Sequence, residues 1–404
     1  MIGNSKLYCG TVEPSDVLRY GREGKPLPSH LLQFAADKKP VVVWNCTRRC
    51  NLRCVHCYSK SADRQYGGEL ATDQGLAMLE DLARFGVPVV LFSGGEPLMR
   101  PNLDVLIRRT VALRMRAVLS TNGTLIDQPT ADRLRGLALS YVGISLDGLQ
   151  EVNDAFRGVP GAFQRALEGV RHCRQAGIKV GLRFTITRRN VGEIDGLFRL
   201  VHEEEVPRIC FYHLVYAGRG AALRQEDLDH EATRRAVDRI LDRTAELHAE
   251  GRPTEVLTVD NHCDGSYLYM RMLREGHPRA PDVLRLLRMN GGNSSGVGIG
   301  CVSWDGAVHA DQFWRHLSLG NVTQRPFSRI WTDLSNPLLA KLKDKRAHVK
   351  GRCATCRFLD ICGGNFRVRA EAATGDLWAP DPACYLSDEE IAPVQEDSAC
   401  PATK

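Results

Sequence analysis

Six short runs rich in β-branched and aromatic residues alternate with amphipathic stretches from residue 41 onward, and this alternation limits the possible fold most strongly. The runs are predicted strands and lie at residues 41–45, 87–93, 116–121, 141–146, 180–186 and 208–214. A helix is predicted over residues 72–85, with Thr72 as its cap and Gly86 at its end, and residues 161–177 have the same design. Because strands that alternate with helices pair in parallel, the sequence predicts an α/β fold with a parallel sheet, either barrel-like or doubly wound.

The predicted domain organisation follows from the sequence after GRG at 218–220, which changes from alternating strands and helices to a charged helical stretch and then to irregular sequence. A chain of 404 residues with 43% apolar content has room for two domains. The last hundred residues contain short strand-like pieces and clustered cysteines, which favours a small domain organised by a metal cluster. We predict an N-terminal extension (1–40), a barrel (41–225), a helical and irregular bridging segment (226–295) and a cluster domain (296–404).

The 14 cysteines and the modest net charge of +6 narrow the function. Without a secretion signal, so many cysteines indicate metal or cluster ligation rather than disulfides, and the cytoplasm is the expected location. No uncharged apolar run of about 18 residues is present, so no membrane span is expected. Lys and Arg are spread along the chain, which gives no indication of a nucleic-acid partner.

The first cysteine group follows the first predicted strand. Cys50, Cys54 and Cys57 have the spacing C-x3-C-x2-C. Three thiolates on one loop can hold three irons of a 4Fe-4S cluster and leave the fourth iron without a protein ligand. A structural zinc site is the alternative, although zinc normally takes four closed ligands. Cys46 is the only nearby fourth thiol, and its place at the end of a strand favours a core or lining role.

The second cysteine group lies near the C-terminus. Cys353, Cys356 and Cys362 have the spacing C-x2-C-x5-C, and Cys384 follows in DPACYL. Four thiolates would close a cluster completely, and they would satisfy zinc equally well. Iron analysis separates these two possibilities.

The segment CTRRCNLRCVHCYS closely resembles the cysteine loop of radical S-adenosylmethionine (SAM) enzymes. In that family the open iron binds the amino and carboxylate groups of SAM, and the reduced cluster cleaves SAM to methionine and a 5′-deoxyadenosyl radical. The resemblance implies a partial (β/α)6 TIM-like barrel with its active site at the C-terminal ends of the strands.

Predicted SAM contacts follow the next strands. The SGGEP segment supplies Gly94 and Gly95, whose backbone can approach a ligand, and Glu96, which the resemblance makes an acceptor for the SAM amino group. Asn122, Ser145 and Asp147 are candidates for ribose or methionine contacts, and Arg183 for the SAM carboxylate. Asn-Gly and Asp-Gly also mark plain turns, and a strand arginine can face solvent, so structural roles stay open.

The second cysteine group resembles the SPASM and twitch extensions of radical SAM proteins, which carry auxiliary 4Fe-4S clusters. Phe366 and Arg325 stand where the full SPASM pattern has further cysteines. One auxiliary cluster is therefore expected, which gives two 4Fe-4S clusters in all.

Longer stretches resemble the radical SAM family of the haem d1 biosynthesis protein NirJ and its relatives in the alternative haem pathway. The resemblance runs from about residue 40 to 391 and includes FYHLVYAGRG, GGNSSGV and DQFWRHLSLGNV. It implies an iron tetrapyrrole substrate, 12,18-didecarboxysirohaem, whose propionate side chains are removed and replaced by oxo groups. It also implies an electron donor such as flavodoxin or ferredoxin.

A flat anionic substrate needs aromatic and cationic side chains, and DQFWRH offers Phe313, Trp314, Arg315 and His316. Trp314 and Arg315 are the candidate substrate residues of this patch. His309 and His213 are candidate axial iron ligands or proton donors. For each of these four residues a core, surface or structural role is the competing interpretation.

Three rival functions stay open. The first is a radical SAM decarboxylase of coproporphyrin-type propionates in the haem pathway. The second is a SPASM-type peptide maturase, although only about forty residues precede the first predicted strand. The third is a binding module with a cluster or zinc, which would not turn over SAM.

Overall fold

The computed structural model describes residues 1–13, 16–20, 39–252 and 254–393 of the 404. Part of the predicted extension 1–40 therefore lies outside the described residues. No helix in the described residues is long and apolar enough to cross a membrane.

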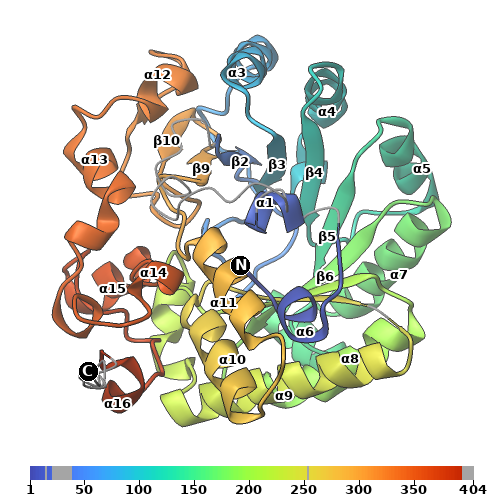
Figure 1. The fold of residues 1–404 in the computed structure, drawn as a ribbon. Helices are drawn as coiled ribbons and strands as arrows, with labels where there is room; N and C mark the ends of the chain where they lie inside the picture. The colour runs from blue at the N-terminus through green and yellow to red at the C-terminus, as the bar shows by residue number, and fades with distance from the viewer. Residues whose placement is uncertain (14–15, 21–38, 253, 394–404) are drawn as a thin grey trace, which may run out of the picture.

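A curved sheet of eleven strands runs through the described residues (Figure 1). Strands β2 to β8 lie side by side in sequence order, and each neighbouring pair is parallel. Their bounds are β2 Val41–Thr47, β3 Val89–Gly94, β4 Arg116–Thr121, β5 Tyr141–Ser145, β6 Val180–Ile186, β7 Arg208–His213 and β8 Glu255–Val259. The six predicted strands are β2 to β7, which confirms the α/β fold with a parallel, barrel-like sheet.

The two edges of the sheet come from the ends of the chain. β9 (Ile299–Val302) pairs in parallel with β2, and β10 (Ala307–His309) and β11 (Gly320–Asn321) follow it antiparallel. On the opposite edge, β1 (Ile2–Gly3) pairs antiparallel with β8. Strand β8 was not predicted, because a buried run of five residues after a long charged helix has no alternation to mark it. The division into domains stays a proposal, since one sheet joins the predicted segments.

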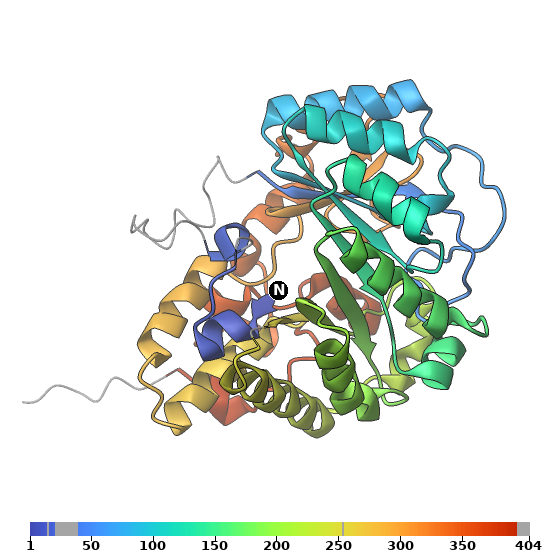
Figure 2. The same ribbon diagram turned by 90° about the vertical axis from the view of Figure 1, so that its right-hand side faces the viewer.

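Helices cover the outer side of the sheet, and the C-terminal segments lie against its other side and its edge (Figure 2). The outer helices are α3 Thr72–Phe85, α4 Leu103–Ala112, α5 Gln128–Gly136, α6 Gln150–Arg157, α7 Ala162–Gln175, α8 Ile194–Glu203 and α9 His230–Ala249. The remaining helices are α1 Asp16–Tyr20, α10 Cys263–Arg274, α11 Ala280–Asn290, α12 Phe327–Trp331, α13 Pro337–Lys343, α14 Leu359–Cys362, α15 Arg367–Thr374 and α16 Asp388–Ile391.

The first predicted helix is α3, with one difference at its start. Thr72 is the first helical residue, and Ala71 takes the cap position. The Ala71 N–H donates to the Gln74 side chain at 2.9 Å, which is the half of a capping box that does not need a polar side chain at the cap position. Gly86 ends the helix in the left-handed conformation, with φ of 89°, as predicted.

The main core lies between the sheet and the outer helices. Trp44, Phe92, Phe184 and Phe211 are fully buried in it, where their large side chains remove much apolar surface from water. Cys173 of α7 also lies in this core.

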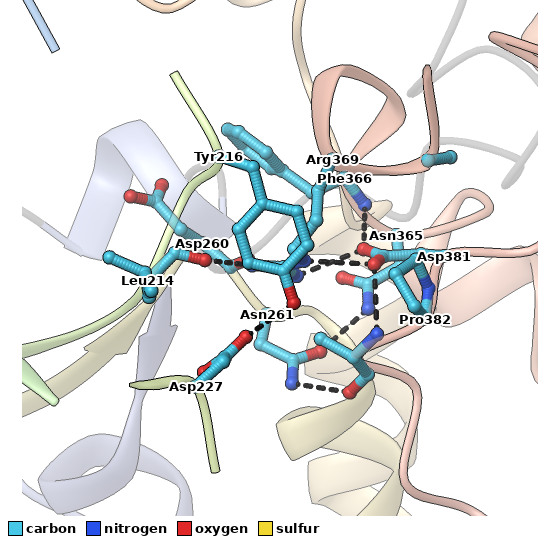
Figure 3. Close-up of polar contacts among 12 residues, drawn as sticks. Leu214, Tyr216, Asp227, Asp260, Asn261, Asn365, Phe366, Arg369, Asp381 and Pro382 are labelled. Atoms are coloured by element: carbon cyan, nitrogen blue, oxygen red, sulfur yellow. Dashed lines mark hydrogen bonds and ion pairs between the residues drawn. The ribbon is translucent and has the colours of Figure 1, made fainter. Parts of the chain in front are cut away.

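A fully buried arginine docks the C-terminal cysteine region on the strand ends (Figure 3). Arg369 of α15 donates from Nε and Nη2 to the two oxygens of Asp381, at 2.8 and 2.9 Å. Its Nη1 donates to the Leu214 carbonyl after β7 at 3.0 Å, and Nη2 donates to the Asp260 carbonyl after β8 at 2.8 Å. One guanidinium group thus joins α15, the segment before Cys384 and two strand ends.

We expect Arg369→Met to lower the free energy of unfolding by about 3–5 kcal/mol, because it leaves the Asp381 carboxylate buried without its cation. Anaerobic denaturant unfolding measures this change. Arg235→Ala is the control, since Arg235 pairs with Glu231 on the surface of α9 and exposed pairs contribute little. Equal stability of Arg369→Met and the unchanged protein would contradict the prediction.

Candidate functional site

The first cysteine group lies on the loop after β2, at the C-terminal edge of the sheet. Cys50, Cys54 and Cys57 line an open cavity with an empty volume of about 1090 Å³. Five further residues predicted for SAM binding line the same cavity, and they come from the ends of β3, β4 and β5 and from the middle of β6: Gly94, Gly95, Asn122, Ser145 and Arg183. The structure therefore brings most of the predicted site together at the edge where a TIM-like sheet holds its active site.

The sulfur atoms of the first group are surrounded by hydrogen-bond donors. Arg157 Nη1 lies 3.6 Å from Cys54 Sγ, and Asn122 Nδ2 lies 3.9 Å from Cys50 Sγ. Burial raises the pKa of Cys50 to about 12 and also raises the pKa of Cys54. The protein alone therefore keeps these thiols protonated, and iron binding would supply the positive charge that removes the protons. Donors beside the sulfurs suit a cluster, because they tune its potential.

No group of three or more His, Cys, Asp and Glu side chains in the described residues is arranged to hold a single metal ion. A 4Fe-4S cluster binds each thiolate through a different iron, so its ligands surround a larger object than one ion. Metal analysis decides between a cluster and zinc.

The two glycines of SGGEP allow the end of β3 to touch the cysteine loop. Gly94 has φ of 130°, and a Cβ atom there would lie 2.2 Å from the Thr47 carbonyl oxygen. A Cβ atom on Gly95 would lie equally close, at 2.2 Å, to the carbonyl oxygen of Arg49. The two glycines therefore let the backbone of β3 pack closely against the start of the cysteine loop. Both glycines also line the cavity.

Glu96 lies behind the cavity wall and is fully buried. Its carboxylate accepts hydrogen bonds from Thr121 Oγ1 at 2.7 Å and from the Asn122 and Leu98 backbone N–H groups at 2.8 and 3.1 Å. Burial raises the pKa of this carboxyl. In this structure Glu96 positions the Asn122 loop, and a direct contact with the SAM amino group stays a prediction.

Asp147 is also fully buried, and it pairs with the Arg157 cation and lies close to the His56 ring. Its Oδ2 lies 2.7 Å from Arg157 Nη2 and 3.3 Å from His56 Nε2. Since Arg157 also contacts Cys54, Asp147 orients an arginine that lies against the cluster loop. The predicted contact of Asp147 with the ribose or methionine of SAM is untested. Arg157 was missed, because nothing in its local sequence indicates a contact with a distant loop.

Arg183 projects from β6 into the cavity. Its Nε donates to Tyr212 Oη at 3.1 Å, and its Nη1 donates to Ser120. Among the described residues, no carboxylate forms an ion pair with Arg183. Asp260 lines the same cavity and interacts with Arg183 only at longer range, so the guanidinium group can still pair with a ligand carboxylate, as the predicted SAM contact requires.

Two further residues shape the cysteine loop. Arg219 Nε donates to the Cys54 carbonyl at 2.7 Å, and Arg219 Nη1 donates to the Ser61 carbonyl at 2.9 Å. Tyr58 donates to Asn45 Oδ1 at 2.9 Å, and its ring packs edge-on against Phe313, with centroids 5.3 Å apart. Tyr58 follows the last cysteine of the group and lines the cavity. The GRG segment signalled only a boundary, so the role of Arg219 was missed.

The four cysteines of the second group line a second, smaller cavity. Cys353, Cys356, Cys362 and Cys384 meet there from α14 and the neighbouring loops. Burial raises the pKa of Cys353, Cys356 and Cys362. These buried thiols, like those of the first group, suit a metal cluster that stabilises their deprotonated form.

Cys263 at the start of α10 is a fifth cysteine beside the second group. It is buried, lines the same cavity and lowers the pKa of Cys384 through a thiol hydrogen bond. The sequence had left Cys263 unassigned, because it lies far from the other four and has no motif around it.

The predicted aromatic and cationic patch of DQFWRH is not formed as one surface. Trp314 is fully buried, and its Nε1 donates to Glu371 at 2.8 Å. Arg315 lies 4.0 Å from the centroid of the Trp304 ring and donates to the Ser59 carbonyl at 2.7 Å. Only Phe313 of the four lines the cavity. The residues alternate between the core and the loop, so substrate contacts of Trp314 and Arg315 stay predictions without geometric support.

The two candidate histidines lie in different surroundings. His309 is buried, and both of its ring nitrogens are bonded, to Ser303 Oγ at 3.0 Å and to the Leu317 carbonyl at 2.9 Å. His213 at the end of β7 lines the cavity, and its Nε2 lies 2.9 Å from Asp264 Oδ2. Only His213 therefore faces the place where a substrate would bind.

Comparisons with known proteins agree with this site. The model of the radical SAM superfamily matches residues 44–201. The chain is 64% identical to the Fe-coproporphyrin III synthase of Methanosarcina barkeri, over 97% of this chain and 99% of that protein. It is 48% identical to the pre-heme d1 synthase of Dinoroseobacter shibae, over 87% of each chain. Among solved structures, Streptococcus suis SuiB bound to precursor peptide SuiA has the same fold, with a TM-score of 0.69 and 19% sequence identity. The match covers 88% of this chain and 79% of that chain.

We expect Cys54→Ala to lose about four of about eight irons per chain after anaerobic reconstitution, because one cluster loses a ligand. Iron analysis measures this. Cys46→Ala is the matched control, because Cys46 is a buried thiol near the end of β2, just before the cysteine loop. The Cys46 Sγ donates to the Ser93 carbonyl at 3.4 Å. Full iron content in Cys54→Ala, or the same loss in both variants, would overturn the assignment of the first group.

Proposed function

The chain belongs to the radical SAM superfamily, and from this premise we propose that it modifies the side chains of an iron tetrapyrrole and forms iron-coproporphyrin III. Family membership implies a 4Fe-4S cluster and SAM as cofactors. The observation that carries the proposal is the 64% identity to a Fe-coproporphyrin III synthase over nearly the full length of both chains. The finer prediction of a haem d1 enzyme is the second candidate, favoured by the 48% identity to a pre-heme d1 synthase.

The first cluster, when bound by Cys50, Cys54 and Cys57, supplies the electron for SAM cleavage and so provides the radical that abstracts hydrogen. The chain itself binds and orients the reactants. Arg183 provides a cation for a carboxylate, and the glycine turn at Gly94 holds the cysteine loop against β3. Tyr58 and Phe313 form an aromatic wall, which suits a planar macrocycle.

We also propose that the second cysteine group holds one auxiliary 4Fe-4S cluster, bound by Cys353, Cys356, Cys362 and Cys384. Its support is the meeting of these thiols in one cavity. Such a cluster would accept an electron from a substrate radical or contact the macrocycle. Flavodoxin or ferredoxin is the proposed donor for the first cluster.

The auxiliary cluster is tested by Cys362→Ala, which we expect to remove about half of the iron while 5′-deoxyadenosine still forms from SAM, because the first cluster is intact. Iron analysis and chromatography of the nucleoside measure the two effects. Cys173→Ala is the control, since Cys173 is a buried core thiol outside both groups. Zinc in the unchanged protein, with iron content that Cys362→Ala does not lower, would support the zinc alternative.

The substrate is tested by incubating the reduced holoenzyme with 12,18-didecarboxysirohaem and SAM, followed by mass spectrometry of the tetrapyrrole. We expect the mass of iron-coproporphyrin III, with no product in Cys54→Ala. A product with two oxo groups would assign the second candidate function. Unchanged substrate, with added iron-coproporphyrin III consumed instead, would favour the decarboxylase rival.

A further inference from the structure

His213 is held by a buried hydrogen-bond chain that leads away from the cavity. The residue ends β7 and is 7% exposed, and its Nε2 lies 2.9 Å from Asp264 Oδ2 on α10. The other oxygen, Asp264 Oδ1, accepts a hydrogen bond from Tyr385 Oη at 2.9 Å. Asp264 and Tyr385 are both buried, so little water competes for these bonds.

This chain fixes which nitrogen of His213 carries the proton. Because a carboxylate can only accept, the neutral imidazole of His213 donates from Nε2 and keeps its lone pair on Nδ1. His213 Nδ1 makes no hydrogen bond within the described residues. The side chain lines the cavity, so an unprotonated imidazole nitrogen is available to a bound molecule.

A histidine that binds a metal usually donates its second N–H to a carboxylate, which orients the ring and raises the basicity of the ligating nitrogen. The His213–Asp264 pair has this arrangement, and imidazole is a common ligand of iron in tetrapyrroles. The metal would arrive with the substrate, since the proposed substrate is an iron tetrapyrrole.

Other histidines do not meet the same conditions. His309 uses both ring nitrogens in bonds to Ser303 and Leu317, so it has no lone pair to offer. His56 lines the cavity and faces Asp147, but its Nδ1 is completely shielded. Of the histidines that line the cavity in the described part of the chain, His213 alone combines a buried carboxylate with an accessible second nitrogen.

We propose that His213 Nδ1 binds the iron of the tetrapyrrole substrate as an axial ligand, and that Asp264, held by Tyr385, orients the His213 ring. This inference rests on the proposed function, because it needs an iron tetrapyrrole in the cavity. Arg183, Tyr58 and Phe313 line the same cavity and provide a cation and aromatic rings for the macrocycle.

The test is the spectrum of ferric iron-coproporphyrin III bound to the SAM-loaded holoenzyme with its clusters oxidised. We expect the Soret band and the electron paramagnetic resonance signal of iron with an imidazole ligand. His213→Ala should lose this signature, and added imidazole should restore it. His309→Ala is the matched control and should keep the signature. Asp264→Asn should weaken binding by about 10–100-fold, as expected for a residue that orients a ligand.

Two results separate this inference from the proposed function. If the unchanged enzyme converts didecarboxysirohaem and His213→Ala leaves the ferric spectrum unchanged, the axial ligand is wrong and the proposed function stands. If the unchanged enzyme binds no iron tetrapyrrole, the proposed function and this inference both fail. His213→Gln, which keeps a polar side chain of similar size, provides the same comparison if His213→Ala does not fold, and cluster content reports the folding of each variant.

Discussion

The buried ion pair between Arg369 and Asp381 connects the second cysteine group to the strand ends beside the first cavity. Removing both charges from water is costly, and the two parallel hydrogen bonds of the pair offset that cost only in this geometry. Asp381 also accepts from the backbone N–H groups of Phe366, four residues after Cys362, and of Ala383, which precedes Cys384. The second cysteine group and the ends of β7 and β8 therefore keep one relative position.

Arginines have a comparable role around the first cysteine group. Arg157 contacts the Cys54 sulfur, Arg219 contacts the Cys54 carbonyl, and Arg315 contacts the Ser59 carbonyl. Each comes from a different part of the chain, so the loop is held by the completed fold rather than by its own residues. Their positive charges also favour an assembly of thiolates and sulfides, which carries negative charge.

The sequence predicted most features that depend on local spacing. The strands β2 to β7 and the helices α3 and α7 follow hydrophobic periodicity, and the cysteines that each spacing groups together line one cavity. Features that depend on distant contacts were not predictable. Cys263 and Asp264 reach their partners only because α10 packs beside the segment of Cys384, and Glu96 and Asp147 turn inward to bond Asn122 and Arg157. Polar residues that follow a strand thus indicate where the site lies, but the sequence does not predict which of their side chains line the cavity.

The pairing of β2 with β9 has a consequence for how the chain folds. Strand β2 comes early in the sequence and pairs with β3 on one side and with β9 on the other. Because Val43 pairs with Cys301, β9 is synthesised more than two hundred residues after β2. During synthesis one edge of β2 therefore stays unpaired until β9 is made. Unpaired strand edges are sites of incorrect association. Such long-range parallel pairing also slows folding, because a large loop must close before the contact forms. Until β9 is made, β2 and the cysteine loop that follows it therefore lack one of their neighbouring strands.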